Sequence, residues 1–207
     1  MGERLAGKVA MVMGAGSIGE GWGNGKATAV AFAREGATVI AVDVNEAAAL
    51  ETVAIIKQEG NQAEAQTLDV TKSAETARLV TDIAARHGRI DVLHNNVGIG
   101  AMGGPIELSE EDWHRVLDVN LTSVFLTCKH VLPVMLAQGK GAIVNVSSVA
   151  AIRNTGYPYS AYYASKGGLN QFTVGLALEY ASQGVRANVI MPGLMNTPHI
   201  YQHISGQ

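Results

Sequence analysis

Short runs of apolar and β-branched residues alternate along this chain with longer segments of helical periodicity, and this alternation constrains the fold most. Six runs are expected to form strands, at residues 8–13, 37–42, 64–68, 91–94, 142–146 and 185–191. Five segments are expected to be helices, at residues 25–35, 46–59, 73–87, 109–138 and 160–182. Such alternation is typical of a parallel sheet covered by helices on both faces. The sequence therefore predicts an α/β fold with a doubly wound parallel sheet, as a single domain over residues 1–207.

Length and charge limit the partners that this chain can have. With 207 residues and 47% hydrophobic content, the chain can bury one sizeable core. The net charge is −3 and the 15 basic residues are scattered, so we expect no nucleic-acid partner. No stretch approaches about 18 uninterrupted apolar residues and no targeting segment is recognisable, so we expect a cytoplasmic protein without a membrane partner.

The single cysteine and the histidines do not indicate a metal site. Cys128 lies in an apolar run and is expected to be a buried thiol. The six histidines show no zinc-type spacing with cysteine or acidic residues, so no metal is expected.

A glycine-rich stretch, GAGSIGEGWGNGK, follows the first expected strand. Its literal G-x-G-x-x-G pattern at Gly14, Gly16 and Gly19 has the spacing of a dinucleotide-binding loop. A helix starting at Gly19 would contain further glycines in its first turns, each costing about 1 kcal/mol relative to alanine. The following KATAVAFAREG is instead rich in helix formers, so the helix is expected to begin near Gly25. Because a helix N-terminus binds phosphate groups, the expected phosphate loop consists of Gly14, Gly23, Asn24 and Gly25.

Asp43 ends the second expected strand at the position where an acid binds adenosine ribose hydroxyls, about 20 residues beyond the loop glycines. A carboxylate there would repel a 2′-phosphate, and no basic residue lies between Gly14 and Gly25. The sequence therefore predicts that the cofactor is NAD(H) rather than NADP(H).

These features resemble the classical short-chain dehydrogenase/reductase family. GAGS followed by GNGKATA is similar to that family's G-x-x-x-G-x-G loop, with five extra residues, Ile18 to Trp22, inserted before the second glycine. Trp22 is interpreted as a packing residue rather than as a cofactor contact. The resemblance implies further cofactor contacts in motif order along the chain, from Asp69, Val70, Asn96, Gly98, Pro192, Gly193 and Thr197.

The resemblance also implies a catalytic tetrad of Asn120, Ser148, Tyr162 and Lys166. Tyr162 would exchange the proton, Lys166 would lower the pKa of that phenol, Ser148 would hold the substrate oxygen and Asn120 would order a relay water. Tyr162 and Lys166 would also touch the cofactor. Residues four apart on a helix have Cβ atoms about 5 to 6 Å apart, and an ammonium lowers the pKa of a nearby phenol. Two alternatives stay open, namely Ser147 for Ser148 and Tyr163 for Tyr162.

The implied activity is hydride transfer between NAD(H) and a secondary alcohol or ketone. The alternative from another class is a dinucleotide-binding protein with little or no turnover, because the segment that covers the substrate would be absent. An NADPH-dependent acyl-chain reductase of the same family is a third hypothesis, which Asp43 disfavours.

The resemblance implies a longer chain than the 207 residues present here. Family members continue into further helices and a seventh strand, so we expect the domain to be C-terminally incomplete and to lack that strand. The family commonly pairs through the long helices expected at 109–138 and 160–182, which implies a homodimer or homotetramer.

Overall fold

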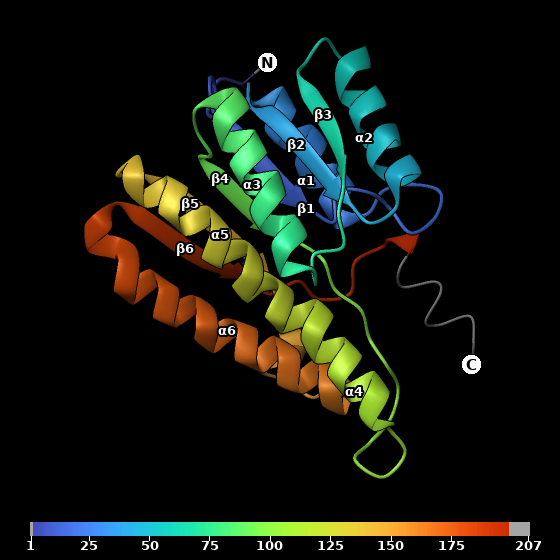
Figure 1. Ribbon diagram of the computed structural model, residues 1–207. Coiled ribbons are helices and arrows are strands. Elements are labelled where there is room, and N and C mark those ends of the chain that lie inside the picture. The colour runs from blue at the N-terminus through green and yellow to red at the C-terminus, as the bar shows by residue number, and fades with distance from the viewer. Residues whose placement is uncertain (1, 199–207) are drawn as a thin grey trace.

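The computed structural model describes residues 2–198, and within this range one parallel sheet has the strand order β3-β2-β1-β4-β5-β6 (Figure 1). Its strands are β1 (Val9–Met13), β2 (Thr38–Asp43), β3 (Ala63–Thr67), β4 (Val92–Asn95), β5 (Gly141–Val146) and β6 (Val185–Ile190). The chain starts in the middle of the sheet, builds outward to β3 and returns past β1. This order reverses direction between β1 and β4, where open α/β sheets form their binding crevices.

Helices cover both faces of the sheet and divide the core in two (Figure 1). One face carries α1 (Asn24–Arg34) and α2 (Glu46–Gln58), and the other carries α3 (Ser73–His87), α5 (Ser123–Ala137) and α6 (Ser160–Tyr180). Strand β1 shows how the sequence serves both layers. Met11 and Met13 pack beneath α3, α5 and α6, whereas Ala10 and Val12 pack beneath α1 and α2. The predicted doubly wound α/β fold is confirmed.

Most expected elements begin and end within one or two residues of their observed bounds. Two expected helix starts carry side-chain caps: Asn45 Oδ1 accepts from the backbone N–H of Ala48, and Ser109 Oγ accepts from that of Asp112. Gly36, just past the end of α1, has a φ of +89°, a conformation that glycine adopts without strain.

The helix expected over 109–138 is divided in the structure. It consists of α4 (Glu110–Leu117), a π-helical segment (Asp118–Thr122) and α5, and it runs through Pro133 without ending there. At the end of the π segment, Ser123 N–H donates to the carbonyl of Asp118, five residues back. Segments of this kind occur frequently at functional sites, and this one contains Asn120.

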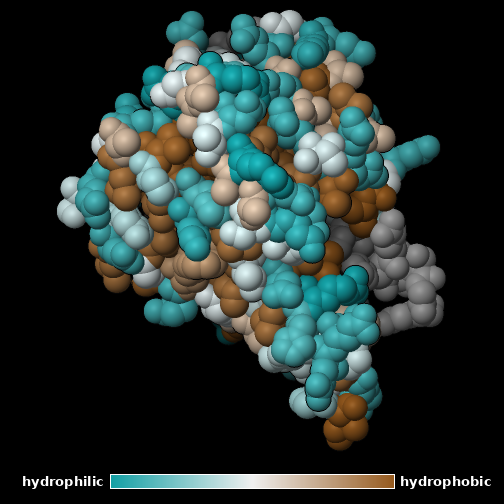
Figure 2. Space-filling model, in the orientation of Figure 1, coloured by the Kyte–Doolittle hydropathy of each residue, from teal (hydrophilic) through white to brown (hydrophobic). Residues whose placement is uncertain are grey.

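The stretch Glu110–Ala137 is long and apolar enough to cross a membrane by length and composition alone. In this protein half of its most apolar window is buried, and α5 packs against α3 and the sheet, so it is a core helix. Hydrophobic and hydrophilic side chains are interspersed over the face shown in Figure 2. Hydrophobic atoms also mark the tip of the loop before α4, where Ile106 is 92% exposed.

Candidate active site

A cleft of about 660 Å³ lies where the six strands end. Its walls come from the loops that follow all six strands, the first two turns of α6, and residues of α4 and of the π-helical segment. The cleft brings together most of the site residues predicted from the sequence: Gly14, Gly23, Asn24, Asp43, Asp69, Val70, Asn96, Gly98, Ser148, Tyr162, Lys166, Pro192, Gly193 and Thr197. Gly25 and Asn120 do not line it, and each lies directly behind residues that do.

The glycine loop follows β1 and ends at Gly23, the residue that caps α1. Helix α1 begins at Asn24, so the predicted register is correct to one residue and the literal pattern ending at Gly19 does not open a helix. Gly14 has a φ of +73° and lies against Val97. A Cβ at Gly25 would overlap the carbonyl oxygen of Gly14. The two glycines therefore allow strand and helix to approach closely enough for the α1 N-terminus to face the cleft.

Gly16 has a role that the sequence reasoning did not assign. Its N–H donates to Asp43 Oδ2 at 2.9 Å, and a Cβ at this position would crowd that carboxylate. The other oxygen, Asp43 Oδ1, accepts from the N–H of Asn45 at 3.0 Å. These two bonds fix the carboxylate at the end of β2 with its edge on the cleft.

The loops after β3 and β4 continue the same wall. Asp69 Oδ1 accepts from the N–H and the hydroxyl of Thr71, which lowers the pKa of this carboxyl. The amide nitrogen of Asn96 donates to the carbonyl of Gly14 at 3.0 Å, so Asn96 braces the tight turn as well as facing the cleft. Arg115 of α4 also lines this end. No spacing signal in the sequence marks it, because it reaches the cleft only through the packing of α4.

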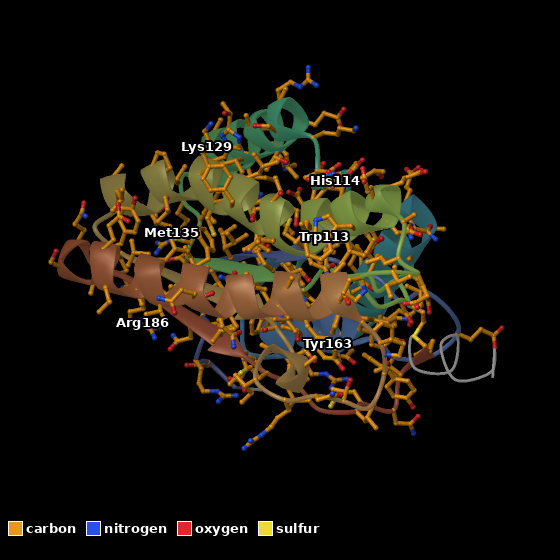
Figure 3. The ribbon with its side chains drawn as sticks, turned by 90° about the horizontal axis from the view of Figure 1, so that it is seen from below. Trp113, His114, Lys129, Met135, Tyr163 and Arg186 are labelled. Atoms are coloured by element: carbon orange, nitrogen blue, oxygen red, sulfur yellow. The ribbon has the colours of Figure 1, made fainter. Side chains whose placement is uncertain are left out.

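Tyr162 and Lys166 lie on one face of α6, as their spacing predicts. The Lys166 ammonium is 5.7 Å from the centre of the Tyr162 ring. Tyr163, labelled in Figure 3, does not line the cleft, and its hydroxyl donates to the carbonyl of Tyr157 and contacts the Thr155 hydroxyl. The geometry therefore favours Tyr162 over Tyr163.

The pKa of Tyr162 departs from the expectation. Burial raises this pKa above its ordinary value, and a hydrogen bond with Ser148 opposes the rise. The predicted lowering is wrong, because desolvation of the phenolate outweighs the groups that stabilise it.

Lys166 is a buried cation. Its side chain donates to the carbonyl of Val146 at 2.9 Å, and burial lowers its pKa to about 8. A Cβ at Gly98 would lie 3.2 Å from Lys166 Nζ. Glycine at position 98 thus leaves room for the ammonium at the cleft wall.

The two serines after β5 have different partners. Ser147 is buried and its hydroxyl donates to the carbonyl of Lys166 at 3.1 Å. Ser148 Oγ accepts from the N–H of Ala150, and the Ser148 side chain acts to lower the pKa of Tyr162. The Ser147 hydroxyl is committed to a backbone carbonyl, whereas the Ser148 side chain influences the phenol of Tyr162, so Ser148 is favoured over Ser147.

Asn120 lies behind the cleft in the π segment. Its Oδ1 accepts from the N–H of Ile99 at 2.8 Å, and its Nδ2 donates to the carbonyl of Ile99 and to Ser165 Oγ. Both N–H donors of the amide are therefore used within the protein, and the side chain anchors the segment after β4.

Two further observations complete the site. The carbonyl of Pro192 accepts from the N–H of Val149, which ties the segment after β6 to the segment after β5. Over residues 2–198, no cluster of histidine, cysteine or acidic side chains is arranged to hold a metal ion.

Comparison with known proteins adds a family to this geometry. The family model for short chain dehydrogenase matches residues 8–205. A 3beta-hydroxysteroid dehydrogenase of Mediterraneibacter gnavus is 40% identical over 193 residues, which are 92% of this chain and 67% of that protein.

Solved structures agree with the strand order and the helix arrangement. A short-chain dehydrogenase/reductase from Burkholderia xenovorans is 49% identical with a TM-score of 0.96, covering 99% of this chain and 81% of that one. An NAD⁺-bound xylitol dehydrogenase is 33% identical with a TM-score of 0.90, covering 97% of this chain and 75% of that one.

Proposed function

The chain belongs to the short-chain dehydrogenase family, whose members are oxidoreductases of alcohols and ketones, and from this premise we propose that it transfers a hydride between NAD(H) and a secondary alcohol or ketone. The observation that carries the proposal is the meeting of two sets of residues in one cleft. A dinucleotide loop and Asp43 occupy one end, and Ser148, Tyr162 and Lys166 occupy the other. A protein that only bound a dinucleotide would not need the second set.

Tyr162 is the proton-transferring residue in this proposal. Its phenol donates a proton to the carbonyl oxygen in ketone reduction and its phenolate accepts the hydroxyl proton in alcohol oxidation. Ser148, which lines the same cleft as Tyr162, holds the same substrate oxygen and stabilises charge that develops on it. The nicotinamide supplies the hydride chemistry, and the protein supplies alignment and the proton.

Lys166 lies close to Tyr162 and has two roles in this proposal, one toward the cofactor and one toward the Tyr162 phenol. One of its three N–H donors is used by the carbonyl of Val146, which leaves donors for a ribose hydroxyl of the cofactor. With a pKa of about 8, Lys166 is mostly charged at neutral pH and favours the phenolate of Tyr162.

We assign Asn120 a positioning role through its amide, which holds Ile99 and thereby the cleft wall after β4. The relay water expected from the sequence would then have to be held by the backbone of the π segment, because both amide N–H groups already have partners.

Asp43 supports NAD(H) over NADP(H). Its carboxylate is fixed at the cleft by the N–H groups of Gly16 and Asn45, where it can accept from two ribose hydroxyls but repels a phosphate. The solved xylitol dehydrogenase, which this chain resembles, is itself NAD⁺-bound.

Fluorescence titration with NADH and NADPH tests this choice. The wild-type protein is expected to bind NADH more tightly, and Asp43→Ser combined with Val44→Arg should shift the affinity ratio toward NADPH. Tighter NADPH binding by the wild type, or an unchanged ratio in the variant, would remove Asp43 from the ribose role.

We further propose a homodimer or homotetramer acting in the cytoplasm on a small alcohol or ketone. Helices α5 and α6 run side by side (Figures 1 and 3), and the rings of Phe125 and Phe172 meet between them. Val174 and Leu178 are exposed on α6, as an interface helix would leave them in a single subunit. Cys128 is buried and free, which suits a reducing compartment.

A further inference from the structure

The inserted segment Ile18–Trp22 borders the cleft at Ile18 and meets the chain after β6 at Pro198. A Cβ built at Gly19 would lie 3.3 Å from Pro198 Cβ, and one at Gly21 would lie 3.9 Å from Pro198 Cγ. Ile18 and Pro198 both line the cleft from these opposite sides. The insertion therefore folds over the cleft beside the N-terminus of α1, where a diphosphate would bind.

A buried lysine holds this insertion. The Lys26 ammonium donates to the carbonyl of Gly21 at 3.1 Å and forms an ion pair with Glu51 of α2 at 2.6 Å. It also lies 5.8 Å from the centre of the Trp22 ring, within range of a cation–π contact. The Lys26 side chain is only 3% exposed. Lys26 is not among the residues that line the cleft.

Burial of an ammonium is costly unless it is paired and hydrogen-bonded, so these contacts keep Lys26 where it is. Two of them, to Gly21 and Trp22, belong to the insertion, and the third belongs to α2. Glycines at 19, 21, 23 and 25 would otherwise give this loop many conformations. Lys26 thus orders the loop before any ligand arrives, which lowers the entropy cost of binding.

We infer that the insertion Ile18–Trp22 forms a wall over the diphosphate of the bound dinucleotide, and that Lys26 is the positioning residue that holds this wall. The inference rests on the proposed dinucleotide binding and assigns Lys26 no contact with the cofactor. Because Pro198 lies beside the insertion, we expect the dinucleotide to leave faster when the insertion moves away from Pro198.

The dissociation rate of NADH tests this inference. In Lys26→Met the stem is kept and the charge is lost, so we expect NADH to leave at least 10-fold faster, measured by stopped-flow displacement. The KM for NAD⁺ should rise by a similar factor, while the KM for the alcohol stays unchanged and kcat does not fall.

Arg34→Met is the matched control, because Arg34 pairs with Glu59 across the same two helices but far from the loop. It should lose a comparable α1–α2 ion pair without changing NADH dissociation. Trp22→Ala, at a position 48% exposed, is a second variant that should fold and should shift NADH dissociation in the same direction by a smaller factor.

Equal dissociation rates in wild type, Lys26→Met and Arg34→Met would overturn the inference, as would a fall of kcat with KM for NAD⁺ unchanged. If Lys26→Met does not fold, an unchanged rate in Trp22→Ala decides against it. A wild-type protein that binds neither NADH nor NADPH would instead remove the proposed function itself.

Discussion

At the scale of single residues, Lys166 shows that the site is built at the expense of stability. In the folded chain its pKa is about 8, below the ordinary 10.5, so the folded protein binds this proton less readily than the unfolded chain. The cost is absent above pH 10.5, grows as the pH falls, and is complete below about pH 8, where it amounts to about 3 kcal/mol.

Lys166→Met should therefore stabilise the protein and inactivate it. Methionine fills the same space without a buried charge, and the loss of one hydrogen bond to Val146 offsets only part of the gain. We expect a rise of about 1 to 2 kcal/mol in the free energy of unfolding at pH 7, measured by urea denaturation, together with loss of alcohol oxidation. A less stable variant would mean that Lys166 is not held as a costly charge.

The sequence predicted which residues would gather at the site, but not their ionisation. The spacing of Tyr162 and Lys166 places them on one helical face, and that much follows from the helix period. The raised pKa of Tyr162 depends on how deeply neighbouring elements bury it, which spacing does not reveal. Arg115 and Lys26 were missed for the same reason, because their contacts join elements distant in the sequence.

At the scale of elements, the start of α1 decides which glycines matter. A Cβ at Gly25 would overlap the carbonyl of Gly14 and come within 2.6 Å of Asn96 Nδ2, both parts of the cleft floor. A Cβ at Gly19 would meet only Pro198, at 3.3 Å. The start of the helix near Gly25 could be predicted because glycine has a weak helix propensity and the helix-forming residues begin only after Gly25.

Gly25→Ala is expected to abolish NADH binding and to destabilise the fold by about 2 kcal/mol or more, whereas Gly19→Ala should weaken NADH binding and stability much less. Titration with NADH and urea denaturation of the two variants measure this difference. The reverse order of effects would restore the literal G-x-G-x-x-G pattern as the phosphate loop.

The π segment was not predictable from the pattern of residues. A π segment adds a single residue to one helical turn, which hardly changes the composition or the hydrophobic periodicity. The sequence therefore predicts one helix over 109–138. Asn120 lies in this segment and accepts a hydrogen bond from the N–H of Ile99, while α5, which follows it, packs against the sheet.

At the scale of the whole molecule, a buried histidine couples stability to pH. His94 of β4 packs edge-on against Phe32 of α1, and neither ring nitrogen has a hydrogen-bond partner among the described residues. Burial lowers its pKa from 6.5 to about 4. The unfolded chain therefore takes up this proton first as the pH falls.

Above pH 6.5, His94 should not change the free energy of unfolding with pH. As the pH falls from 6.5 to 4, His94 should lower the free energy of unfolding by about 3 kcal/mol. His94→Leu should remove that loss, so the difference in unfolding free energy between variant and wild type should grow over this interval. A difference that stays constant from pH 7 to pH 4 would show that His94 is not buried in its neutral form.

The doubly wound parallel sheet could be predicted at this scale because strands and helices alternate with clear periodicity. The contact between the insertion and Pro198 could not be predicted, because it joins the loop after β1 to the segment after β6. Only the folded chain brings those two loops to the same end of the sheet.

The most direct test of the central claim is the oxidation of secondary alcohols by NAD⁺ in Tyr162→Phe, with Tyr163→Phe as the neighbouring control. We expect Tyr162→Phe to bind NADH normally and to lose activity by orders of magnitude, because it keeps the ring and lacks the exchangeable proton. Tyr163→Phe should retain most activity, since its hydroxyl serves the loop at Thr155 and Tyr157. Equal residual rates in wild type and Tyr162→Phe would contradict the account.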